Sequence, residues 1–503
     1  MASENSFDGF VKRLGFEKFP FSQFSTENEL HIRDKLFYSP SDYSQILEAF
    51  SSGQSMFVLG NRGSGKTAML YDFESKVEKS TCLIAWLDDF TILNSPFTSC
   101  DFYNMLIQKI TDKVFEQLVN QRDRIDNIKP EQKMLLVYLL KHFLPVVSKP
   151  HLTEQIEKVR YPWLVYMSVK VYNFIRDALN YGVSVAMQVT SDIIRQHFMS
   201  LPPIPKELML KKYFPEIPYE ADKEFEPQKV TYSFLERCLE LVQNLGFKQF
   251  VLIIDKIDED SRFSNDADLI ADFIEPVLTD NKLLLNPKIQ LLISIWNIPF
   301  SILIDKVRSQ KHFSATLNWE TSDLKEALNK RIRVFSNEKV QKFELLFSDD
   351  VLSNHFNDIF YLANGNPRDL WHIFKHLFYA QHKIDPLSTS ISSGAVKEGL
   401  KNFVESFNYF EYYPRKANAA PQSLNIYSYI QHLLRLGKKE FTRNAFKEAT
   451  GVSGGSVSNY VSQMQKMGLI VNIDREGTSL VYEVNDPKVT YAIDNGYSII
   501  RSN

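Results

Sequence analysis

The sequence of 503 residues predicts an α/β fold, and three features of the chain lead to that prediction. The first is a set of short apolar runs with the composition of buried strands, at residues 57–59, 82–86, 250–254 and 289–296. The second is the spacing of apolar residues at i, i+3 and i+4 in several segments between these runs, which indicates helices. The third is that glycine or acidic residues follow two of the runs directly, where ligands of such sheets bind.

The composition is typical of a soluble globular protein, with 44% apolar and 24% charged residues. The 58 basic and 61 acidic residues give a net charge of -3, so no global positive field indicates a nucleic-acid partner. Three cysteines without a CxxC spacing favour a reducing compartment and disfavour a zinc site. Because no apolar window approaches the roughly 18 residues of a membrane span, we expect a cytoplasmic protein with no membrane partner.

A glycine-rich segment follows the first apolar run and precedes a helix predicted over residues 68–79. It fits G-x-x-x-x-G-K-[ST] and consists of Gly60, Asn61, Arg62, Gly63, Ser64, Gly65, Lys66 and Thr67. Its glycines let backbone N–H groups converge on an anion, and the helix N-terminus adds its own donors. Lys66 would reach the β- and γ-phosphates, and the Thr67 hydroxyl would complete the coordination of Mg²⁺. The pattern predicts a nucleotide site; the alternative is a chance glycine turn.

Acidic residues end the apolar run at 250–254. Asp255 is placed to act on the Mg²⁺ side through water, because it projects from the carboxyl end of a central strand. Asp258 and Glu259 follow closely and are candidates to polarise an attacking water. The alternative is a solvated acidic turn. Asn297 follows the run at 289–296, where its side chain could sit between the acidic residues and the γ-phosphate.

Two segments before the glycine-rich loop contain aromatic turns, Phe-Pro-Phe at 19–21 and Phe-Tyr at 37–38, followed by an amphipathic helix over 41–51. These turns could form an apolar wall for adenine, or could only pack on the core. Both alternatives stay open from the sequence.

Further along the chain, several arginines are candidates for contacts with phosphate. A helix over 322–331 is expected to have its cap at Thr321 or Ser322, and Arg308, Arg331 and Arg333 either serve a neighbouring subunit's nucleotide or are surface residues. A later helix begins with Asn366 as cap and Pro367 in its first turn. Arg368 follows them and would either grip the γ-phosphate or be solvated.

Residues 99–246 are predicted to be almost wholly helical, with helices at 102–121, 133–144 and 165–181. A plain βαβ unit needs only about 30 residues, so this region is predicted to be an inserted helical subdomain. No catalytic pattern is evident in it.

After a linker at 413–423, three helices (424–436, 442–450 and 456–467) and two strands (469–473 and 480–484) predict a winged-helix variant of the helix-turn-helix. If this module binds DNA, the contacts would come from Ser456, Ser458, Asn459, Ser462, Gln463 and, at the tip of the wing, Arg475. The alternative is a packing or oligomerisation module, since basic residues barely outnumber acidic ones here.

The set formed by Gly60 to Thr67, the Asp255 motif, Asn297, Gly365-Asn366-Pro367-Arg368 and the terminal module resembles AAA+ ATPases of the origin-recognition type and their relatives, the STAND signalling ATPases. It looks most like uncharacterised bacterial P-loop ATPases of that branch, some of which are linked to defence against phage. The resemblance covers residues 10 to 95 and 245 to 490.

The resemblance implies an N-terminal arm (1–50), a P-loop ATPase core (51–98 and 247–335) interrupted by the helical insertion (99–246), a helical lid (336–412) and a winged-helix domain (424–490). It also implies ATP and Mg²⁺ as cofactors, with Lys66, Thr67 and Asp255 as ligands, Asn297 as first sensor and Arg368 as second. One departure is Lys256, which stands where typical AAA+ members have Glu. Fast hydrolysis then requires that Asp258 or Glu259 take that role.

The leading hypothesis from the sequence is a slowly hydrolysing, ATP-driven switch that controls its own assembly into a homo-oligomer or an effector protein, in bacterial anti-phage defence for example. The second hypothesis is an ATP-regulated DNA-binding regulator or loader that uses the winged helix. A kinase or other phosphoryl transferase is disfavoured, because the sequence offers no constellation for an acceptor.

Overall fold

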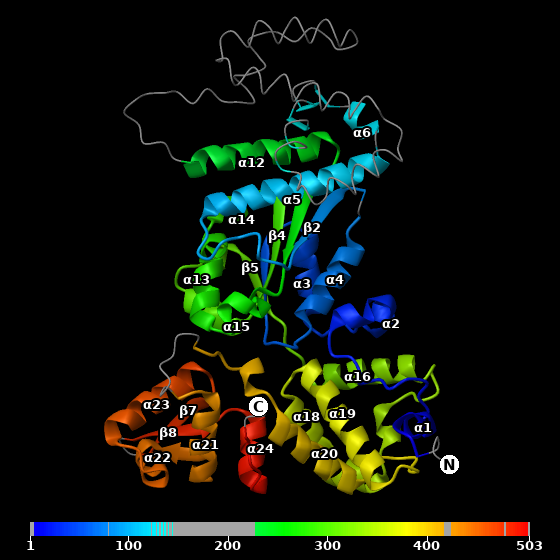
Figure 1. Cartoon of the computed structure of the whole chain (residues 1–503), viewed down its shortest axis with the longest axis vertical. Helices are drawn as coiled ribbons and strands as arrows, with labels where there is room; N and C mark the ends of the chain where they lie inside the picture. Colours follow the sequence, from blue (N-terminus) through cyan, green and yellow to red (C-terminus); the bar gives the residue numbers. More distant parts are fainter. Residues whose placement is uncertain are drawn as a thin grey trace, which may run out of the picture.

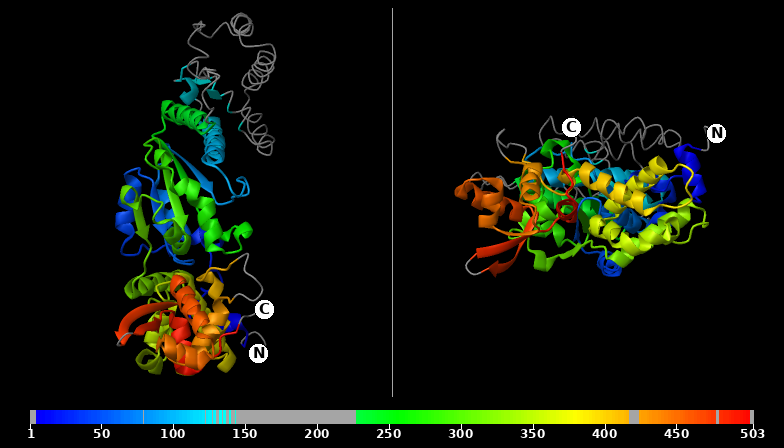
Figure 2. Two further views of the ribbon diagram at one scale, coloured as in Figure 1. Left: turned by 90° about the vertical axis from the view of Figure 1, so that its left-hand side faces the viewer. Right: turned by 90° about the horizontal axis from the view of Figure 1, so that it is seen from below.

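The computed structural model describes residues 5–78, 80–121, 227–416, 424–476 and 479–500, together with 123–126, 128–129, 132–133, 135–136, 139 and 143. The helix expected over 165–181 and most of the one expected over 133–144 lie outside these residues. The described elements form two tiers, a sheet with its helices above and a helical assembly below (Figures 1 and 2).

The upper tier is built on a parallel five-stranded sheet in the order β2-β3-β4-β1-β5. Its strands are β1 (Met56–Leu59), β2 (Cys82–Leu87), β3 (Gln249–Ile254), β4 (Ile289–Ile295) and β5 (Phe313–Thr316). The first four were predicted to within one residue at most ends. Every residue of β4 is buried, as expected for a parallel strand covered on both faces.

Alternate residues of the strands enter two separate cores on the two faces of this sheet. Met56, Val58 and Leu292 pack with α3 (Tyr43–Ser51) and α4 (Lys66–Lys76). The strand residues that alternate with these, such as Phe57, Leu291 and Ile293, pack on the opposite face with five helices. Those elements are α5 (Ser99–Asn120), α12 (Pro227–Asn244), α13 (Ala267–Leu278), α14 (Asn281–Leu284) and α15 (Asn297–Leu303).

The helices α5 and α12 run side by side over the top of the sheet (Figure 1). Thr98 caps α5, and Asp101 completes a capping box. Both helices bury apolar side chains in the same core as the sheet, including Leu106, Leu239 and Val242. They are followed along the chain by the short helix α6 (Asp123–Asp126) and by β3, respectively. The described ends of the predicted insertion are thus part of the upper tier's core.

The lower tier combines the predicted lid with the N-terminal arm. It contains α1 (Phe7–Arg13), α16 (Thr321–Phe335), α17 (Asp349–Asn354), α18 (Phe356–Ala363), α19 (Pro367–Ile384) and α20 (Ser393–Ser406). The sequence analysis placed the residues of α16 in the ATPase core. In the structure, α16 buries Leu324, Leu328 and Ile332 in the core of the lower tier. The cap predicted at Thr321 or Ser322 is wrong: Glu320 is the N-cap and forms a capping box with Asp323.

The C-terminal elements lie beside the lid helices (Figure 1). They are α21 (Ile426–Leu436), β6 (Glu440–Thr442), α22 (Arg443–Thr450), α23 (Gly454–Lys466), β7 (Ile470–Glu476), β8 (Ser479–Val484) and α24 (Pro487–Asn495), with an antiparallel sheet in the order β6-β8-β7. The turn predicted from 474 is wrong because β7 continues to Glu476, and β6 and α24 were not anticipated. These elements share one continuous core with the lid.

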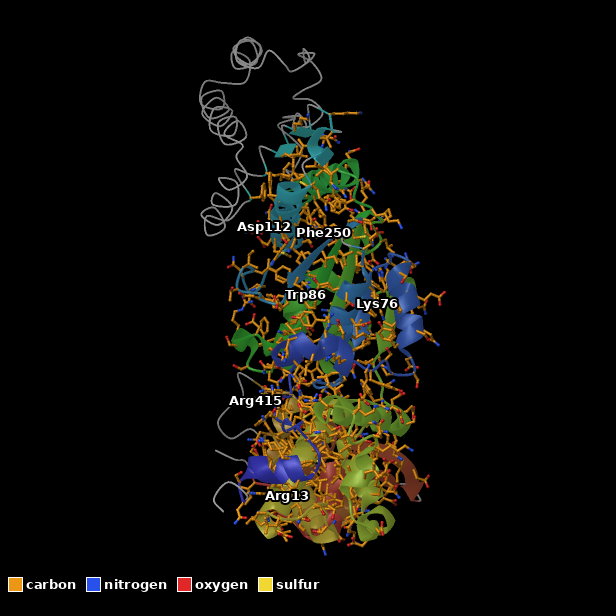
Figure 3. The ribbon with its side chains drawn as sticks, turned by 90° about the vertical axis from the view of Figure 1, so that its right-hand side faces the viewer. Arg13, Lys76, Trp86, Asp112, Phe250 and Arg415 are labelled. Carbon is orange, nitrogen blue, oxygen red and sulfur yellow. The ribbon has the colours of Figure 1, made fainter. Side chains whose placement is uncertain are left out.

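The two tiers meet near Arg415, which Figure 3 labels between them. The Arg415 N–H donates to the carbonyl of Asn265 at 3.0 Å, and Asn265 Nδ2 donates to the Tyr413 carbonyl at 3.3 Å. None of the helices in the described part of the chain is long and apolar enough to span a membrane.

Candidate nucleotide site

The glycine-rich loop connects β1 directly to α4. Gly63 and Gly65 have φ values of 81° and 89°, in the left-handed region that side chains with a Cβ rarely adopt. A Cβ on Gly60 would lie only 2.5 Å from Ser64 Oγ. The helix α4 begins at Lys66, two residues earlier than predicted, so its unpaired N–H groups lie immediately behind the loop. The loop therefore has the tight backbone that an anion cradle requires.

Lys66 is buried with its ammonium group across the loop. Its Nζ donates to the carbonyls of Gly60 at 2.9 Å and Asn61 at 3.0 Å, and only 9% of the residue is exposed. Burial lowers the pKa of Lys66, an effect that the carboxylates of Asp258 and Asp255 oppose. Both bonds are to neutral acceptors, which a phosphate oxygen could replace with a charged one.

Thr67 and Asp255 come together at the base of the loop. Thr67 Oγ1 donates to Asp255 Oδ2 at 2.7 Å, and Asp255 is only 2% exposed. Burial raises the pKa of the Asp255 carboxyl. A hydroxyl and a carboxylate are the oxygen donors that Mg²⁺ takes at such sites, so these two residues fit the predicted metal position.

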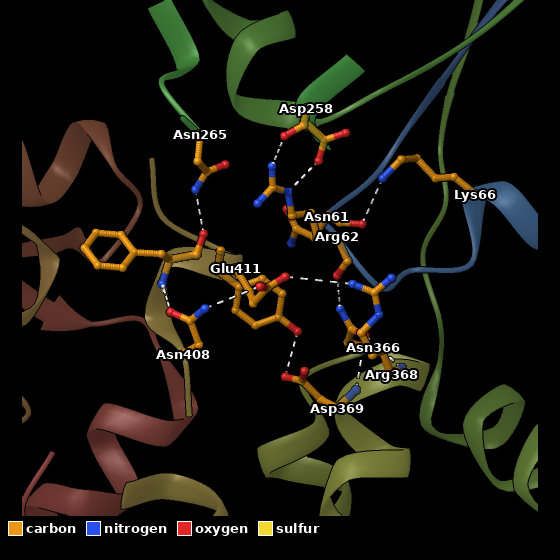
Figure 4. A network of polar contacts seen from close by, with 12 residues as sticks. Asn61, Arg62, Lys66, Asp258, Asn265, Asn366, Arg368, Asp369, Asn408 and Glu411 are labelled. Carbon is orange, nitrogen blue, oxygen red and sulfur yellow. Dashed lines mark hydrogen bonds and ion pairs between the residues drawn. The ribbon is translucent and has the colours of Figure 1, made fainter. Parts of the chain in front are cut away.

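Asp258 is held by the loop itself. Arg62 Nε lies 2.5 Å from Asp258 Oδ2, and Arg62 Nη2 donates to the Asp258 backbone carbonyl (Figure 4). The guanidinium also lies over the ring of Trp296, 5.3 Å from its centre. Burial would raise the pKa of Asp258, but Arg62 and Lys66 outweigh burial and hold the pKa below its ordinary value. Asp258 is therefore an ionised, engaged carboxylate.

Glu259 is the neighbouring residue in the short helix η2 (Ile257–Glu259), and it is exposed at the cavity wall. Partial burial of its carboxyl and the charge of Asp258 raise the pKa of Glu259. Lys256, which comes three residues earlier, pairs with neither Asp258 nor Glu259. Its Nζ lies 2.6 Å from Glu27 Oε1 of the N-terminal arm. The Lys256 side chain is thus directed to the N-terminal arm.

A cavity of about 410 Å³ extends from the loop between the two tiers. Phe37 and Tyr38 line it, as does Phe24, whose ring stacks on His372 at 3.9 Å. Phe19 and Phe21 instead pack on the lid residue Phe378, at 5.3 and 5.7 Å between ring centres. Phe37 and Tyr38 thus lie where they could contact a base, whereas Phe19 and Phe21 pack against the lid; contact with adenine stays a prediction.

The lid lies directly on the loop (Figure 4). Asn366 caps α19 by accepting from the N–H groups of Arg368 and Asp369, and its Nδ2 donates to the Arg62 carbonyl at 2.6 Å. A Cβ on Gly63 would lie 2.7 Å from both Arg368 Cβ and Asn366 Oδ1. The Arg368 guanidinium lines the cavity, with its Nη1 3.8 Å from Glu411 Oε2. The close approach of these residues explains why position 63 is glycine.

Other predicted residues are placed as follows. Asn297 begins α15 with its Oδ1 buried and without a hydrogen-bond partner among the described residues, and it is not part of the cavity wall as described. Arg331 is 4% exposed and donates to Glu29 and to the Pro20 carbonyl of its own chain, so it is occupied in cis. The position of Arg331 after a predicted helix start gave no sign of this pairing.

The sequence analysis gave no role in the site to Trp319. Its Nε1 donates to the Ser64 carbonyl at 2.7 Å, and its ring lines the cavity. Trp319 follows β5 closely, and the carboxyl end of a parallel strand is where ligand-contacting residues are expected. The strand β5 has only four residues, which hid that signal.

The residues predicted for DNA contact lie on one side of α23. Ser458 and Asn459 are exposed and Ser456, Ser462 and Gln463 are partly exposed, whereas Val457, Val461 and Met464 are buried on the opposite side. Arg475 lies in β7, where it pairs with Leu480 of β8.

No protein-family model matches the chain, and no curated protein matches it. One solved structure of the ORC2 protein from Aeropyrum pernix, in ADPNP-ADP complexes, matches with 12% identity and a TM-score of 0.40 over 92% of this chain and 96% of that chain. A second, in the ADP form, matches with 12% identity and a TM-score of 0.33 over 96% and 97%. The assignment of the site therefore rests on its own residues.

Proposed function

We propose that the protein binds ATP with Mg²⁺ at the glycine-rich loop and hydrolyses it slowly, as a switch of the AAA+/STAND type. The observation that carries the proposal is the meeting of Lys66, Thr67 and Asp255 at the loop with the lid helix α19 seated on it. The cavity has Lys66 and Arg368 at its loop end and aromatic residues of the arm in its wall, which suits a nucleoside triphosphate and its base.

In this proposal each residue has one task. Lys66 would exchange its loop carbonyls for phosphate oxygens. Thr67 and Asp255 would hold Mg²⁺, which would supply positive charge to offset that of the phosphates. Glu259 accepts a proton from the attacking water as the water oxygen bonds to the γ-phosphorus. The bond from that phosphorus to the bridging oxygen breaks, and ADP and phosphate are formed.

Slow turnover follows from the acids that are available. Asp258 is ion-paired to Arg62, and Lys256 stands where a Glu would usually activate water. Of the acids Asp255, Asp258 and Glu259 that line the cavity, Glu259 is the exposed one, and no hydrogen bond holds its side chain among the described residues. A base that must first be oriented gives a slower reaction than one already in position.

The switch itself would act through α19. Asn366 and Arg368 connect the loop to this helix, and Arg368 can turn from Glu411 to the γ-phosphate. Loss of the γ-phosphate then removes one of the lid's attachments. The output stays a prediction: assembly into a homo-oligomer, or control of an effector such as one used in defence against phage.

The nucleotide assignment is tested with Lys66→Ala and, as matched control, Lys76→Ala at the other end of α4, where the Lys76 side chain is 42% exposed and pairs with Asp72. We expect Lys66→Ala to weaken ATP binding by about 100-fold or more, because it removes a buried charge-assisted contact. Lys76→Ala should bind as the wild type does. Unchanged affinity in Lys66→Ala would refute the site.

A second candidate function is ATP-regulated DNA binding, and the polar exposed side of α23 favours it. We infer that α21 to β8 form a winged helix with α23 as its recognition helix. Duplex DNA affinity should then fall steeply with salt and differ with and without ATP, and Asn459→Ala should weaken it. Absence of binding at low salt would leave the effector or assembly switch as the proposal.

A further inference from the structure

Residues 26–36, which form the 3₁₀ helix η1 (Thr26–Ile32) and the helix α2 (Arg33–Leu36), are called the strap below. They cross the junction between the tiers, with α2 lying between α4 and α16 in Figure 1. Several of their residues line the nucleotide cavity, namely Thr26, Glu27, Glu29, Arg33 and Leu36. The strap therefore forms one wall of the cavity, and a nucleotide could be enclosed by it.

Two acidic residues of the strap attach it to two different tiers. Glu27 Oε1 lies 2.6 Å from Lys256 Nζ at the end of β3 in the upper tier. Glu29 accepts from both terminal nitrogens of Arg331 in α16, at 2.6 and 3.0 Å. The strap thus bridges the residues that follow Asp255 and the helix that begins the lower tier.

The two attachments differ in burial. The side chains of Arg331 and Glu29 are 5% and 13% exposed, whereas those of Lys256 and Glu27 are 22% and 33% exposed. A more solvated ion pair is weaker and more easily broken, and it is screened by salt. Arg33 adds one bond to the upper tier, from Nη1 to the Tyr71 carbonyl at 3.2 Å. The ion pair at Glu27 is therefore expected to be the weaker of the two.

The backbone of Lys256 supports a built contact. Lys256 has φ 61°, in the left-handed region, which residues with a long side chain seldom adopt. The same residue is the first after Asp255, so a change in its direction would disturb the metal side of the site. With this backbone, the Lys256 ammonium reaches Glu27 of the strap and not the neighbouring acids.

We propose that Lys256 is a positioning residue for the bound nucleotide: through Glu27 it keeps the strap closed over the cavity, and breaking of this ion pair controls nucleotide entry and release. The inference rests on the proposed ATP site. It also gives a physical role to the residue that departs from the Glu of typical AAA+ members. In this proposal Lys256 controls access to the cavity, whereas typical AAA+ members have a catalytic Glu at that position.

The test measures the release rate of a fluorescent ATP analogue from the full chain by stopped flow. The variants are Glu27→Gln, Lys256→Gln, both together, and the charge swap Glu27→Lys with Lys256→Glu. Lys113→Gln, which removes an exposed pair with Glu116 on α5, is the matched control. We expect each single variant and the neutral double variant to release about three- to five-fold faster, and the charge swap to recover most of the difference.

The salt dependence of the release rate distinguishes an ion pair from a purely structural role of Glu27 and Lys256. Release from the wild type should accelerate with salt, and release from Glu27→Gln should depend on salt less. Faster release in Lys256→Gln without a change in Glu27→Gln would overturn the inference, as would independent, additive effects of the two. If Lys66→Ala binds normally, the proposed function itself fails; if only the strap variants are unchanged, the gate alone fails.

Discussion

Glu259 and Asp258 are neighbours in one turn, yet their surroundings give their carboxyl groups opposite shifts in pKa. Arg62 and Lys66 hold the pKa of Asp258 down against burial, whereas partial burial and the charge of Asp258 raise that of Glu259. A carboxylate with a raised pKa is the stronger base, and it is also the more exposed of the two. Chemistry and access therefore both favour Glu259 as the residue that accepts a proton from water.

A pH profile of ATP hydrolysis tests this assignment. A general base acts only when it is deprotonated, so the rate should fall as the pH drops through the raised pKa of Glu259, which lies above the ordinary value of 4.5. Glu259→Gln should lower the rate by about 100-fold or more and remove this limb of the profile. The comparison is Asp258→Asn, measured over the same range.

Asp258→Asn and Glu259→Gln should change different properties of the protein. Asp258→Asn removes the partner of Arg62 and should change the stability of the loop and the binding of ATP, but leave the acid limb of the profile in place. If Asp258→Asn abolishes the limb and Glu259→Gln keeps it, the roles are reversed. If both keep it, neither carboxylate is the base.

At the scale of elements, α19 is a helix of the lid that contacts the glycine-rich loop directly. Its cap, Asn366, satisfies the N–H groups of Arg368 and Asp369 and also donates to the Arg62 carbonyl. One side chain thus fixes both the start of the helix and its seat on the loop. In the proposed switch, Asn366 would transmit a change in loop geometry on nucleotide binding to α19.

Asn366→Ala should therefore have two effects. Loss of the cap should cost about 1 kcal/mol of stability, and loss of the bond to the loop should weaken ATP binding. Asn425→Ala is the matched control, because Asn425 caps α21 through Ser428 in the same way but away from the loop. Thermal unfolding and ATP titration of both variants separate the effects. Equal ATP affinities in the two variants would contradict the role of Asn366.

How far the sequence alone led can be seen from particular elements. The strands β3 and β4 were predicted because central parallel strands are continuous apolar runs, and Asn366 and Pro367 marked the start of α19 through local capping chemistry. The strand β5 was missed because Phe313–Thr316 is short, at the sheet edge and half polar. Trp319 was missed with it.

The contacts that connect distant segments had no local signal. Glu27 with Lys256 and Asp369 with Lys488 are pairs far apart in the chain, and neither periodicity nor a motif relates their members. The sequence therefore predicted that the glycine-rich loop and the acidic residues after β3 lie together, but not that an arm residue contacts Lys256 or that a C-terminal residue contacts Asp369. Such residues depend on the three-dimensional arrangement of whole segments.

At the scale of the molecule, a buried ion pair joins α19 of the lid to α24. Lys488 of α24 is fully buried, with Nζ 3.0 Å from Asp369 Oδ2, and it lies over the rings of Phe407 and Tyr412. Tyr412 also donates to Asp369 at 2.7 Å. Because Asp369 directly follows Arg368, movement of the start of α19 displaces a partner of α24.

Lys488→Met should lower the free energy of unfolding of the lower tier by about 3–5 kcal/mol, because it leaves the Asp369 carboxylate buried without its counter-charge. Lys439→Met is the control: it removes a shorter pair, 2.6 Å, with Asp494 of the same helix, but one that is nearly half exposed, and it should cost about 0–1 kcal/mol. Urea unfolding at neutral pH gives both values.

The pH dependence of the loss of stability in Lys488→Met identifies the cause of that loss. Burial raises the pKa of Asp369 and Lys488 opposes this, so removal of Lys488 raises the pKa further. A carboxyl with a raised pKa in the folded state favours folding when protonated and loses that contribution as the pH rises. The deficit of Lys488→Met should therefore be largest at neutral pH and shrink on acidification, and Asp369→Leu in the same chain should recover part of it at neutral pH. A deficit that is constant with pH would show that lost packing of the Lys488 side chain, and not its charge, connects α24 to the lid.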